Sequence, residues 1–432
     1  MKKTLLAIGL CIAAGAGAAE AIMSLEGSYI LPIEDRAIRY TDHGRRNAVA
    51  RLHERLAARE TGLDYDDRSG YLPSLLKALD VPVSSQVLVF SKTSFQAARI
   101  HPANPRAIYF NDSVAIGHVP GSDLLELTAT DPDAGVVFFT LDQTNTGAPA
   151  LTRRTHECLQ CHAIPRTLGV PGLVVRSVYP DRSGMPIFRA GSFFTDHRSP
   201  LEQRWGGWYV TGTHGAARHM GNRFAVDEAG TLEAGSGTPI VALDRFFDPG
   251  RHLAPHSDLA ALMVLEHQVR LTNLITRVAW ETKLALAYHA NRAVMLNEPA
   301  GEWSDAIRRR IQQPAEVLLR SLLMVDESPL PSAVKGTSGF AREYSARGPR
   351  DQRHRSLYEL DLTRRLYRYR CSPLIYSEQF AGLPREVRDY VYRRLVEVLD
   401  GTDRSADFTG FTDDERSAVL AILRETLPDL PR

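Results

Sequence analysis

Residues 124–141 read LLELTATDPDAGVVFFTL and contain the clearest indication of the fold class. Two runs rich in β-branched and aromatic residues, 124–130 and 135–141, stand on either side of Asp131, Pro132 and Asp133. Short runs of this composition, separated by Asp and Pro, are typical of β-strands joined by tight turns. The stretch therefore predicts two neighbouring antiparallel strands.

Similar runs precede this stretch, at residues 86–91, 107–110 and 114–118. Before them, apolar residues at helical spacing predict an amphipathic helix over 47–60. We interpret residues 22–150 as a mainly antiparallel sheet with a flanking helix. Residues 151–235 combine short strands with many polar loops, and the chain reaches this region from a strand and a loop.

The periodicity becomes helical after about residue 236. Ser257 and Asp258 precede a long pattern that predicts a helix to about residue 295. A second helix over 304–324 contains Pro314, which should kink or split it. Residues 326–352 are predicted to form a long connection, and further helices are predicted over 357–370, 384–399 and 413–425. The chain is therefore an α+β protein with a helical subdomain over 236–432.

The N-terminus has the pattern of a secretory signal peptide over residues 1–21. Lys2 and Lys3 precede an apolar run over 5–14, and small residues follow it. This run is shorter than the roughly 20 residues of a membrane-spanning helix, so no transmembrane span is expected in the mature chain. We expect a periplasmic or secreted protein.

The charge is almost balanced, with 52 basic and 51 acidic residues and a formal net charge of +1. A protein that binds nucleic acids would be expected to carry a surplus of basic residues, so no nucleic-acid partner is expected. Outside the signal peptide the cysteines are Cys158, Cys161 and Cys371. An odd number argues against a disulfide framework, and Cys371 is predicted to be a buried, inert thiol.

Residues 158–162 read CLQCH, the C-x-x-C-H spacing at which a c-type haem is attached covalently. Two thiols separated by two residues can each add to a vinyl group of one macrocycle, and the adjoining imidazole can then ligate the iron. In these five positions the chain resembles c-type cytochromes. The resemblance implies one covalent haem c, held by Cys158 and Cys161, with His162 as the proximal ligand of its iron.

Two other interpretations of this motif stay open. His156, Cys158, Cys161 and His162 together form a possible zinc-binding set, although four ligands within seven residues would be strained. The two cysteines alone could instead form a redox-active or structural disulfide.

The surroundings of the motif differ from those of small cytochromes c. A resemblance over the whole domain would imply a helix just before the motif and a compact helical domain around it. Residues 169–173, Gly-Val-Pro-Gly-Leu, resemble the stretch that lies behind the proximal histidine in that family. We therefore expect a proline carbonyl, of Pro171 or of Pro165, to accept the ring N–H of His162.

The sixth iron ligand would decide the function, since methionine raises the potential and a vacant site permits small-molecule chemistry. Met220 is the first candidate, because it lies in a glycine-flanked loop after the motif. The other candidates are Met185, His214, His219 and His197. Haem walls are expected from Trp205, Trp208 and Tyr209, and propionate partners from Arg198, Arg204 or Arg218.

Residues 195–222 and 367–378 also look similar to stretches of large, secreted, single-haem bacterial proteins of uncharacterised activity. The leading hypothesis is a periplasmic monohaem cytochrome that exchanges single electrons with a redox partner protein or a small-molecule donor or acceptor. The alternative is a haem-dependent oxidoreductase, or a gas- or peroxide-responsive protein, with an open distal site. A third hypothesis is a zinc-stabilised or cofactor-free interaction protein.

Overall fold

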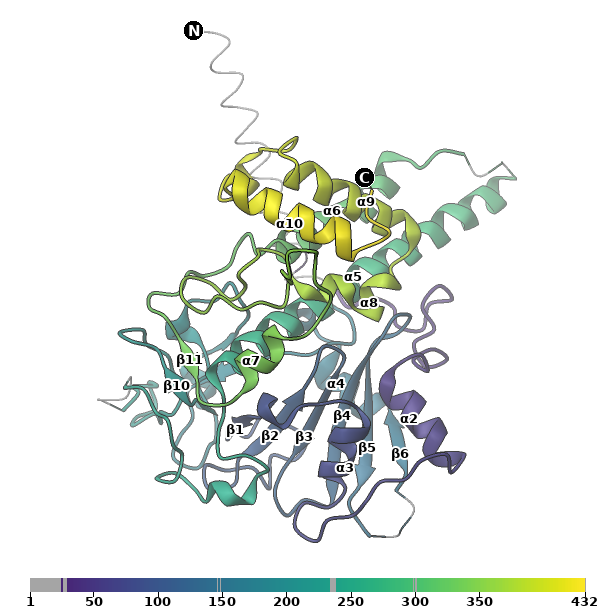
Figure 1. Cartoon of the computed structure of the whole chain (residues 1–432). Helices are drawn as coiled ribbons and strands as arrows, with labels where there is room; N and C mark the ends of the chain where they lie inside the picture. Colours follow the sequence, from purple (N-terminus) through teal and green to yellow (C-terminus); the bar gives the residue numbers. More distant parts are fainter. Residues whose placement is uncertain are drawn as a thin grey trace.

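A computed structural model describes residues 29–145, 149–233, 238–297 and 301–431, together with residues 25, 147 and 299 (Figure 1). The predicted signal peptide, residues 1–21, lies outside the described residues. Sequence reasoning gave an α+β protein, and the structure confirms this class. A mostly N-terminal antiparallel sheet is followed by a region of helices.

The main sheet has seven strands in the order β6-β5-β4-β3-β2-β1-β9, and each neighbouring pair is antiparallel. The strands are β1 (Val87–Val89), β2 (Arg106–Phe110), β3 (Val114–His118), β4 (Leu124–Asp131), β5 (Gly135–Asp142), β6 (Leu151–Arg154) and β9 (Trp208–Tyr209). The predicted strand pair over 124–141 is β4 and β5. The Asp131 carboxylate accepts hydrogen bonds from the backbone N–H groups of Asp133 and Ala134, which fixes the turn between them.

The two faces of this sheet have different burial. On β4, Leu125, Leu127 and Ala129 are buried in the main hydrophobic core, together with residues of α2 (Ala48–Ala57) and α3 (Leu72–Ala78). The alternate residues Glu126 and Thr128 point to the opposite face and are only half-buried. That second face is where the candidate site lies.

The longest helix, α5 (Leu259–Leu296), begins where the sequence predicted. The carboxylate of Asp258 caps it by accepting hydrogen bonds from the N–H groups of Ala260 and Ala261. Its first half packs with Val87, Val89 and Phe110 in a second hydrophobic cluster, and its second half forms a hairpin with α6 (Asp305–Leu322) (Figure 1). The helix therefore joins the sheet to the C-terminal helices, and one hydrophobic core runs through both.

The C-terminal helices α9 (Arg385–Leu399) and α10 (Asp413–Thr426) match the predicted ranges. Thr412 and Glu415 form a capping box at the start of α10. The shorter helices are α4 (His156–His162), α7 (Phe340–Ser345) and α8 (Glu378–Ala381). The remaining short strands are β7 (Arg176–Val178), β8 (Ser192–Phe194), β10 (Gly212–Thr213) and β11 (Lys335–Gly336).

Two expectations about the helical region did not hold in full: a helix over 357–370, and a kink or split at Pro314, of which the split is wrong and the kink stays a prediction. Residues 357–370 form turns closed by a bridge between Leu360 and Tyr367. The Asp361 carboxylate accepts hydrogen bonds from two following backbone N–H groups, and this local turn competes with a helix. Pro314 does not split α6, which stays continuous because apolar residues on both sides of the proline are buried in the same core.

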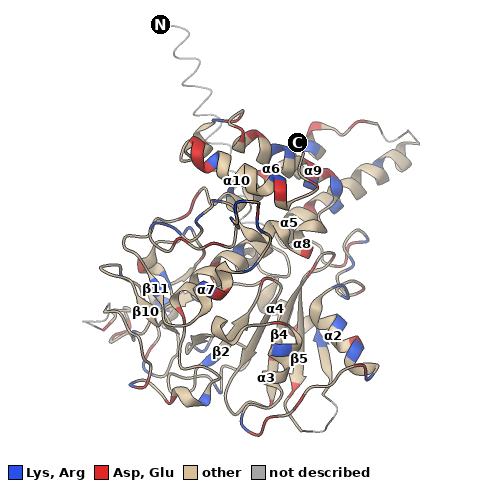
Figure 2. Ribbon diagram, viewed as in Figure 1, with Lys and Arg blue, Asp and Glu red and all other residues tan. Residues whose placement is uncertain are grey.

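Acidic and basic residues are intermixed over the elements in view (Figure 2), as the balanced composition suggests. Within the described ranges, the structure contains no helix with the length and apolar character needed to cross a bilayer. The domain boundaries at 150 and 235 stay predictions.

Candidate functional site

The C-x-x-C-H motif occupies the single short helix α4, directly after strand β6 and one linking residue, Thr155. Helical spacing brings positions 158, 161 and 162 to one face, because residues three and four apart are neighbours on a helix. Cys158 is half-buried and Cys161 is exposed, and both are free thiols. Two thiols and one imidazole are therefore presented by one short helix. The sequence predicted a strand and a loop before the motif, whereas strand β6 leads into α4 through a single residue.

His162 is held in one orientation by the loop that follows α4. Its Nδ1 lies 2.9 Å from the carbonyl oxygen of Gly172. That carbonyl accepts a hydrogen bond, so Nδ1 carries the proton and Nε2 presents its lone pair. No described residue makes a hydrogen bond or ion pair with Nε2. The ring packs on Phe138 of β5, with 4.9 Å between ring centroids.

The acceptor differs from the expected one. A proline carbonyl, of Pro171 or Pro165, was predicted to accept the His162 N–H, but the acceptor is Gly172, the residue after Pro171. The Gly172 N–H also donates to the His162 carbonyl over 2.8 Å, so the loop folds back onto the end of α4. The backbone after Pro171 therefore turns so that the Gly172 carbonyl, and not that of Pro171, faces the His162 ring.

The loop is itself fixed by α5. Asn273 accepts a hydrogen bond from the N–H of Leu173 and donates one to its carbonyl, over 3.0 Å and 2.7 Å. A Cβ atom at Gly172 would lie 2.3 Å from Oδ1 of Asn273, so only glycine fits beside this amide. Asn273 therefore positions the residue that orients His162.

Burial lowers the pKa of His162, and the Arg106 charge acts in the same direction, against the Gly172 hydrogen bond and the Glu126 charge. The imidazole is therefore neutral at neutral pH, which is the form that ligates metal ions. Burial raises the pKa of Cys158 to about 11, with contributions from the Glu126 and Glu157 charges. Arg106 and Glu126 form an ion pair 2.8 Å long on the half-buried sheet face.

Phe138, Gly172, Asn273, Arg106 and Glu126 were not identified from the sequence. Strand pairing places Phe138 opposite Thr128, so both side chains lie on the face that carries Glu126. The alternation of β4 shows which residues share this face. Nothing in the sequence shows that α4 lies over it.

Met220 is buried in the loop that follows β10 and has its own protein contacts. Its N–H donates to the Arg204 carbonyl, and its sulfur accepts a hydrogen bond from the Ser177 hydroxyl over 3.5 Å. No contact described in the structure joins Met220 to His162. Its role as the distal ligand stays a prediction.

The three histidine candidates lie in two buried pairs, one of which also contains His267. His197 and His267 lie with their Nδ1 atoms 3.3 Å apart, and His267 Nε2 lies 2.7 Å from the Ser372 hydroxyl. His214 and His219 pack edge to face, with 4.8 Å between ring centroids. Met185, by contrast, is exposed.

The expected haem walls and propionate partners contact other protein groups. Trp205, Trp208 and Tyr209 are buried, and Trp208 donates its ring N–H to the Arg176 carbonyl. Arg204 is buried in an ion pair 3.0 Å long with Glu266, and Arg198 pairs with Asp196. Cys371 is buried, as predicted, and burial raises the pKa of its thiol to about 12.

Over the described ranges, no group of three or more His, Cys, Asp or Glu residues is arranged to hold a metal ion. The four donors of the zinc interpretation therefore do not converge on one point. Comparison with known proteins gave no match, either to a protein-family model, to a curated protein or to a solved structure.

Proposed function

We propose that this protein is an exported monohaem c-type cytochrome that exchanges single electrons with a redox partner protein or a small-molecule donor or acceptor. The observation that carries this proposal is the state of His162. Its Nδ1 is fixed by a backbone carbonyl and its Nε2 has no described protein partner, beside two free thiols on the same helix face. Metal-ligating histidines characteristically have their second nitrogen fixed in this way.

The residues fit a covalent haem. The S–H groups of Cys158 and Cys161 would add across the two vinyl groups, forming two thioether bonds without loss of any atom. His162 would serve as the proximal iron ligand, with its orientation and basicity set by the Gly172 carbonyl. Bound haem would supply a one-electron iron couple. Phe138 and the half-buried face of the sheet lie beside His162 and would form part of the protein surface around a bound haem.

The predicted export is consistent with the same proposal, because the cytochrome resemblance implies haem attachment outside the cytoplasmic membrane. The predicted signal peptide over residues 1–21 would direct the chain there. Met220 is retained as the proposed distal ligand in this electron-transfer form.

The test is expression of the full chain with its N-terminus and a c-type haem-maturation system, followed by mass spectrometry of the exported protein. We expect the added mass of one haem, retained after acid-acetone extraction, and a sharp reduced α band. Replacing both Cys158 and Cys161 with alanine should abolish the added mass. His156→Ala is the matched control, because His156 is an exposed histidine of the same helix. A bare chain would refute the proposal.

One observation favours the alternative of a haem enzyme or gas-responsive protein. A pocket of about 30 Å³ is lined by Thr128, Ala115 and Leu173, among others. Thr128 lies opposite Phe138, whose ring contacts His162. A pocket of this volume has room for a diatomic molecule.

Carbon monoxide distinguishes the two forms. Rapid binding to the reduced protein, with no change in rate when Met220 is replaced by alanine, would favour the open site. Binding that becomes fast only in Met220→Ala would favour Met220 as the sixth ligand and electron transfer as the function. Ser177→Ala is the control, because it removes the described hydrogen bond to the Met220 sulfur while keeping the sulfur.

A further inference from the structure

Three tyrosines of the second hydrophobic cluster meet beside the first half of α5. Tyr344 belongs to α7, and Tyr358 and Tyr367 lie in the turns over residues 357–370. Their exposed fractions are 2%, 7% and 1%, in that order. These three phenols are therefore shielded from solvent, and we refer to them as the tyrosine cluster.

The members of the tyrosine cluster are in contact with one another. The hydroxyl oxygens of Tyr344 and Tyr367 lie 3.1 Å apart and share a hydrogen bond. The ring of Tyr344 also packs on that of Tyr358, with 5.3 Å between ring centroids. Separations in this range are those of aromatic rings in direct contact. Tyr344 thus contacts both other phenols and covers the ring of Tyr358.

The Tyr358 hydroxyl is bonded to a carboxylate. It donates a hydrogen bond over 2.8 Å to Oδ2 of Asp112, which lies between β2 and β3. The other oxygen of Asp112 accepts a hydrogen bond from the side-chain amide of Gln268, on α5, over 2.7 Å. The guanidinium of Arg347 lies 3.1 Å from Oδ2. The carboxylate is thus held in one position, with the phenol as one of its donors.

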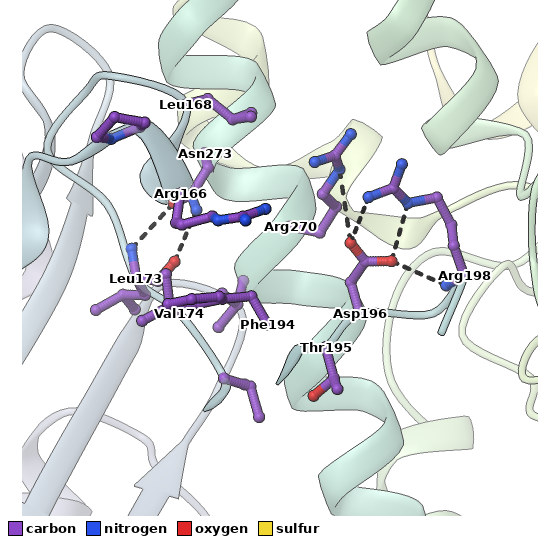
Figure 3. A pocket seen from close by; sticks show the side chains of 13 residues that line it. Arg166, Leu168, Leu173, Val174, Phe194, Thr195, Asp196, Arg198, Arg270 and Asn273 are labelled. Carbon is purple, nitrogen blue, oxygen red and sulfur yellow. Dashed lines mark hydrogen bonds and ion pairs between the residues drawn. The ribbon is translucent and has the colours of Figure 1, made fainter. Parts of the chain in front are cut away.

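A second carboxylate beside α5, that of Asp196, has different donors. Arg198 donates hydrogen bonds to both of its oxygens, over 2.9 Å and 2.8 Å, and Nε of Arg270 lies 4.0 Å from it (Figure 3). A guanidinium keeps its protons in proteins, so no proton passes from these arginines to Asp196. The donor to Asp112 is a phenol, which can release its proton.

Each phenol of the tyrosine cluster is protonated at physiological pH, because burial raises the pKa of all three well above the ordinary value of about 10. A phenol that loses an electron becomes a strong acid, and an unpaired positive charge in a buried site is costly. Oxidation of a buried tyrosine therefore requires a proton acceptor within hydrogen-bond distance. Tyr358 has this acceptor in Asp112, whereas the hydroxyls of Tyr344 and Tyr367 are bonded to each other.

We propose that Tyr358 and Asp112 form a proton-coupled one-electron donor. A one-electron oxidant takes one electron from the phenol, and the phenolic proton passes to the Asp112 carboxylate. The products are a neutral tyrosyl radical at Tyr358, a neutral carboxylic acid at Asp112 and the reduced oxidant. The other members of the tyrosine cluster exclude water from the radical and so prolong its lifetime.

This inference rests on the proposed function only for the physiological oxidant. Asp112 and Thr128 line the same pocket of about 30 Å³, and Thr128 lies opposite Phe138, whose ring contacts His162. The donor is therefore close to the sheet face that carries the proposed haem site. A haem that has reacted with peroxide, under the alternative function, is a one-electron oxidant of the required class.

The experiment oxidises the full-length chain, as purified, with ruthenium(III) tris(bipyridine) generated by light and a cobalt(III) quencher. Samples are treated with ascorbate, frozen and measured by electron paramagnetic resonance. Ascorbate removes radicals from exposed tyrosines such as Tyr288, whose exposed fraction is 60%. We expect a tyrosyl signal that survives ascorbate in the parent chain and is lost in Tyr358→Phe. Asp112→Asn should also lose it, because an amide accepts a hydrogen bond but does not take up the proton.

Two further variants are matched controls and should keep the signal. Tyr109 is equally buried, but its hydroxyl donates to the neutral amide oxygen of Gln86 over 2.7 Å, so Tyr109→Phe tests the need for a carboxylate. Tyr390 donates to the Glu316 carboxylate over 2.6 Å but is only half-buried, so Tyr390→Phe tests the need for burial.

Three results would overturn the inference: no ascorbate-resistant signal in the parent chain, an equal signal in Tyr358→Phe, or an equal loss in Tyr109→Phe. Circular dichroism shows whether each variant is folded. If Tyr358→Phe does not fold, Asp112→Asn decides, and a full signal in that variant would overturn the role of the carboxylate. The oxidant is supplied, so a chain that takes up no haem is tested in the same way and the two proposals fail separately.

Discussion

The α4 site and the polar cluster around Glu266 contrast in how their chemical groups are used. Around Glu266, carboxylate, guanidinium, hydroxyl and imidazole groups are buried and bonded to one another. At α4, two free thiols and one ring nitrogen are left without described partners. The richer set of reactive residues is structural, whereas the sparser set is available for chemistry. Density of reactive residues in the sequence is therefore a poor guide to the site.

The largest effect is expected from breaking the buried pair. Arg204→Met should lower the free energy of unfolding by about 3–5 kcal/mol, because the buried Glu266 carboxyl loses its ion-pair partner and must be buried unpaired or take up a proton. Chemical denaturation followed by circular dichroism measures this change. Arg385→Met, which removes an exposed arginine, should cost no more than about 1 kcal/mol. Equal losses of stability in the two variants would show that the polar cluster around Glu266 does not stabilise the fold.

The next effect concerns the pH dependence of stability and His118, a buried histidine at the end of β3. Burial, with the Arg251 charge, lowers the pKa of His118 to about 4, below the ordinary value of 6.5. The unfolded chain then binds more protons between these values, so stability is complete above pH 6.5 and is lost as the pH falls toward 4. The loss attributable to His118 should be about 3 kcal/mol.

Denaturation curves measured between pH 4 and 7 check this expectation. His118→Gln should flatten the dependence of unfolding free energy on pH in that window. His53→Gln, on an exposed histidine, serves as the control. An unchanged slope in His118→Gln would contradict the assignment.

A smaller effect tests the loop behind His162. Gly172→Ala would place a Cβ atom 2.3 Å from the Asn273 side chain, so the loop must shift at a cost of about 1–3 kcal/mol. The same shift should change the absorbance spectrum of the haem-loaded protein, because the acceptor of His162 moves. Gly62→Ala is the control, since no heavy atom lies within 4 Å of a Cβ there.

The smallest change in stability is expected at the proposed ligand itself. His162→Gln in the haem-free chain should alter the free energy of unfolding by about 1 kcal/mol or less, since it removes one hydrogen bond from a half-buried side chain. Urea denaturation of chain produced without haem maturation provides the measurement. A loss as large as that of Arg204→Met would mean that His162 is a structural residue.

Much of the fold followed from local patterns. Runs of β-branched and aromatic residues predicted β3, β4 and β5, and Ser257 and Asp258 predicted the start of α5. The short and polar strand β6 was missed because its sequence, LTRR, has little strand character of its own and depends on pairing with β5. The helix expected over 357–370 failed because side-chain turns compete with helical bonds.

The site could be predicted only in part. Spacing alone singles out Cys158, Cys161 and His162, whose role stays a prediction. The acceptor of the His162 ring N–H was expected at Pro171 or Pro165 and is Gly172, one residue after Pro171. Arg106, Phe138 and Asn273 could not be found, because each reaches the motif through contacts between distant segments of the chain. Such contacts depend on how α4 and α5 lie relative to the sheet.

The separation of Leu173 and Asn273 along the chain has a consequence for the order in which the site folds. These residues lie 100 positions apart, and Asn273 emerges later than the motif during synthesis or export. Until α5 has folded against it, the loop behind His162 lacks the two hydrogen bonds that the Asn273 side chain makes with the Leu173 backbone. If haem is attached as proposed, the attaching enzyme would reach the two sulfurs while the segment that carries them is still flexible, before docking of α5 fixes the loop.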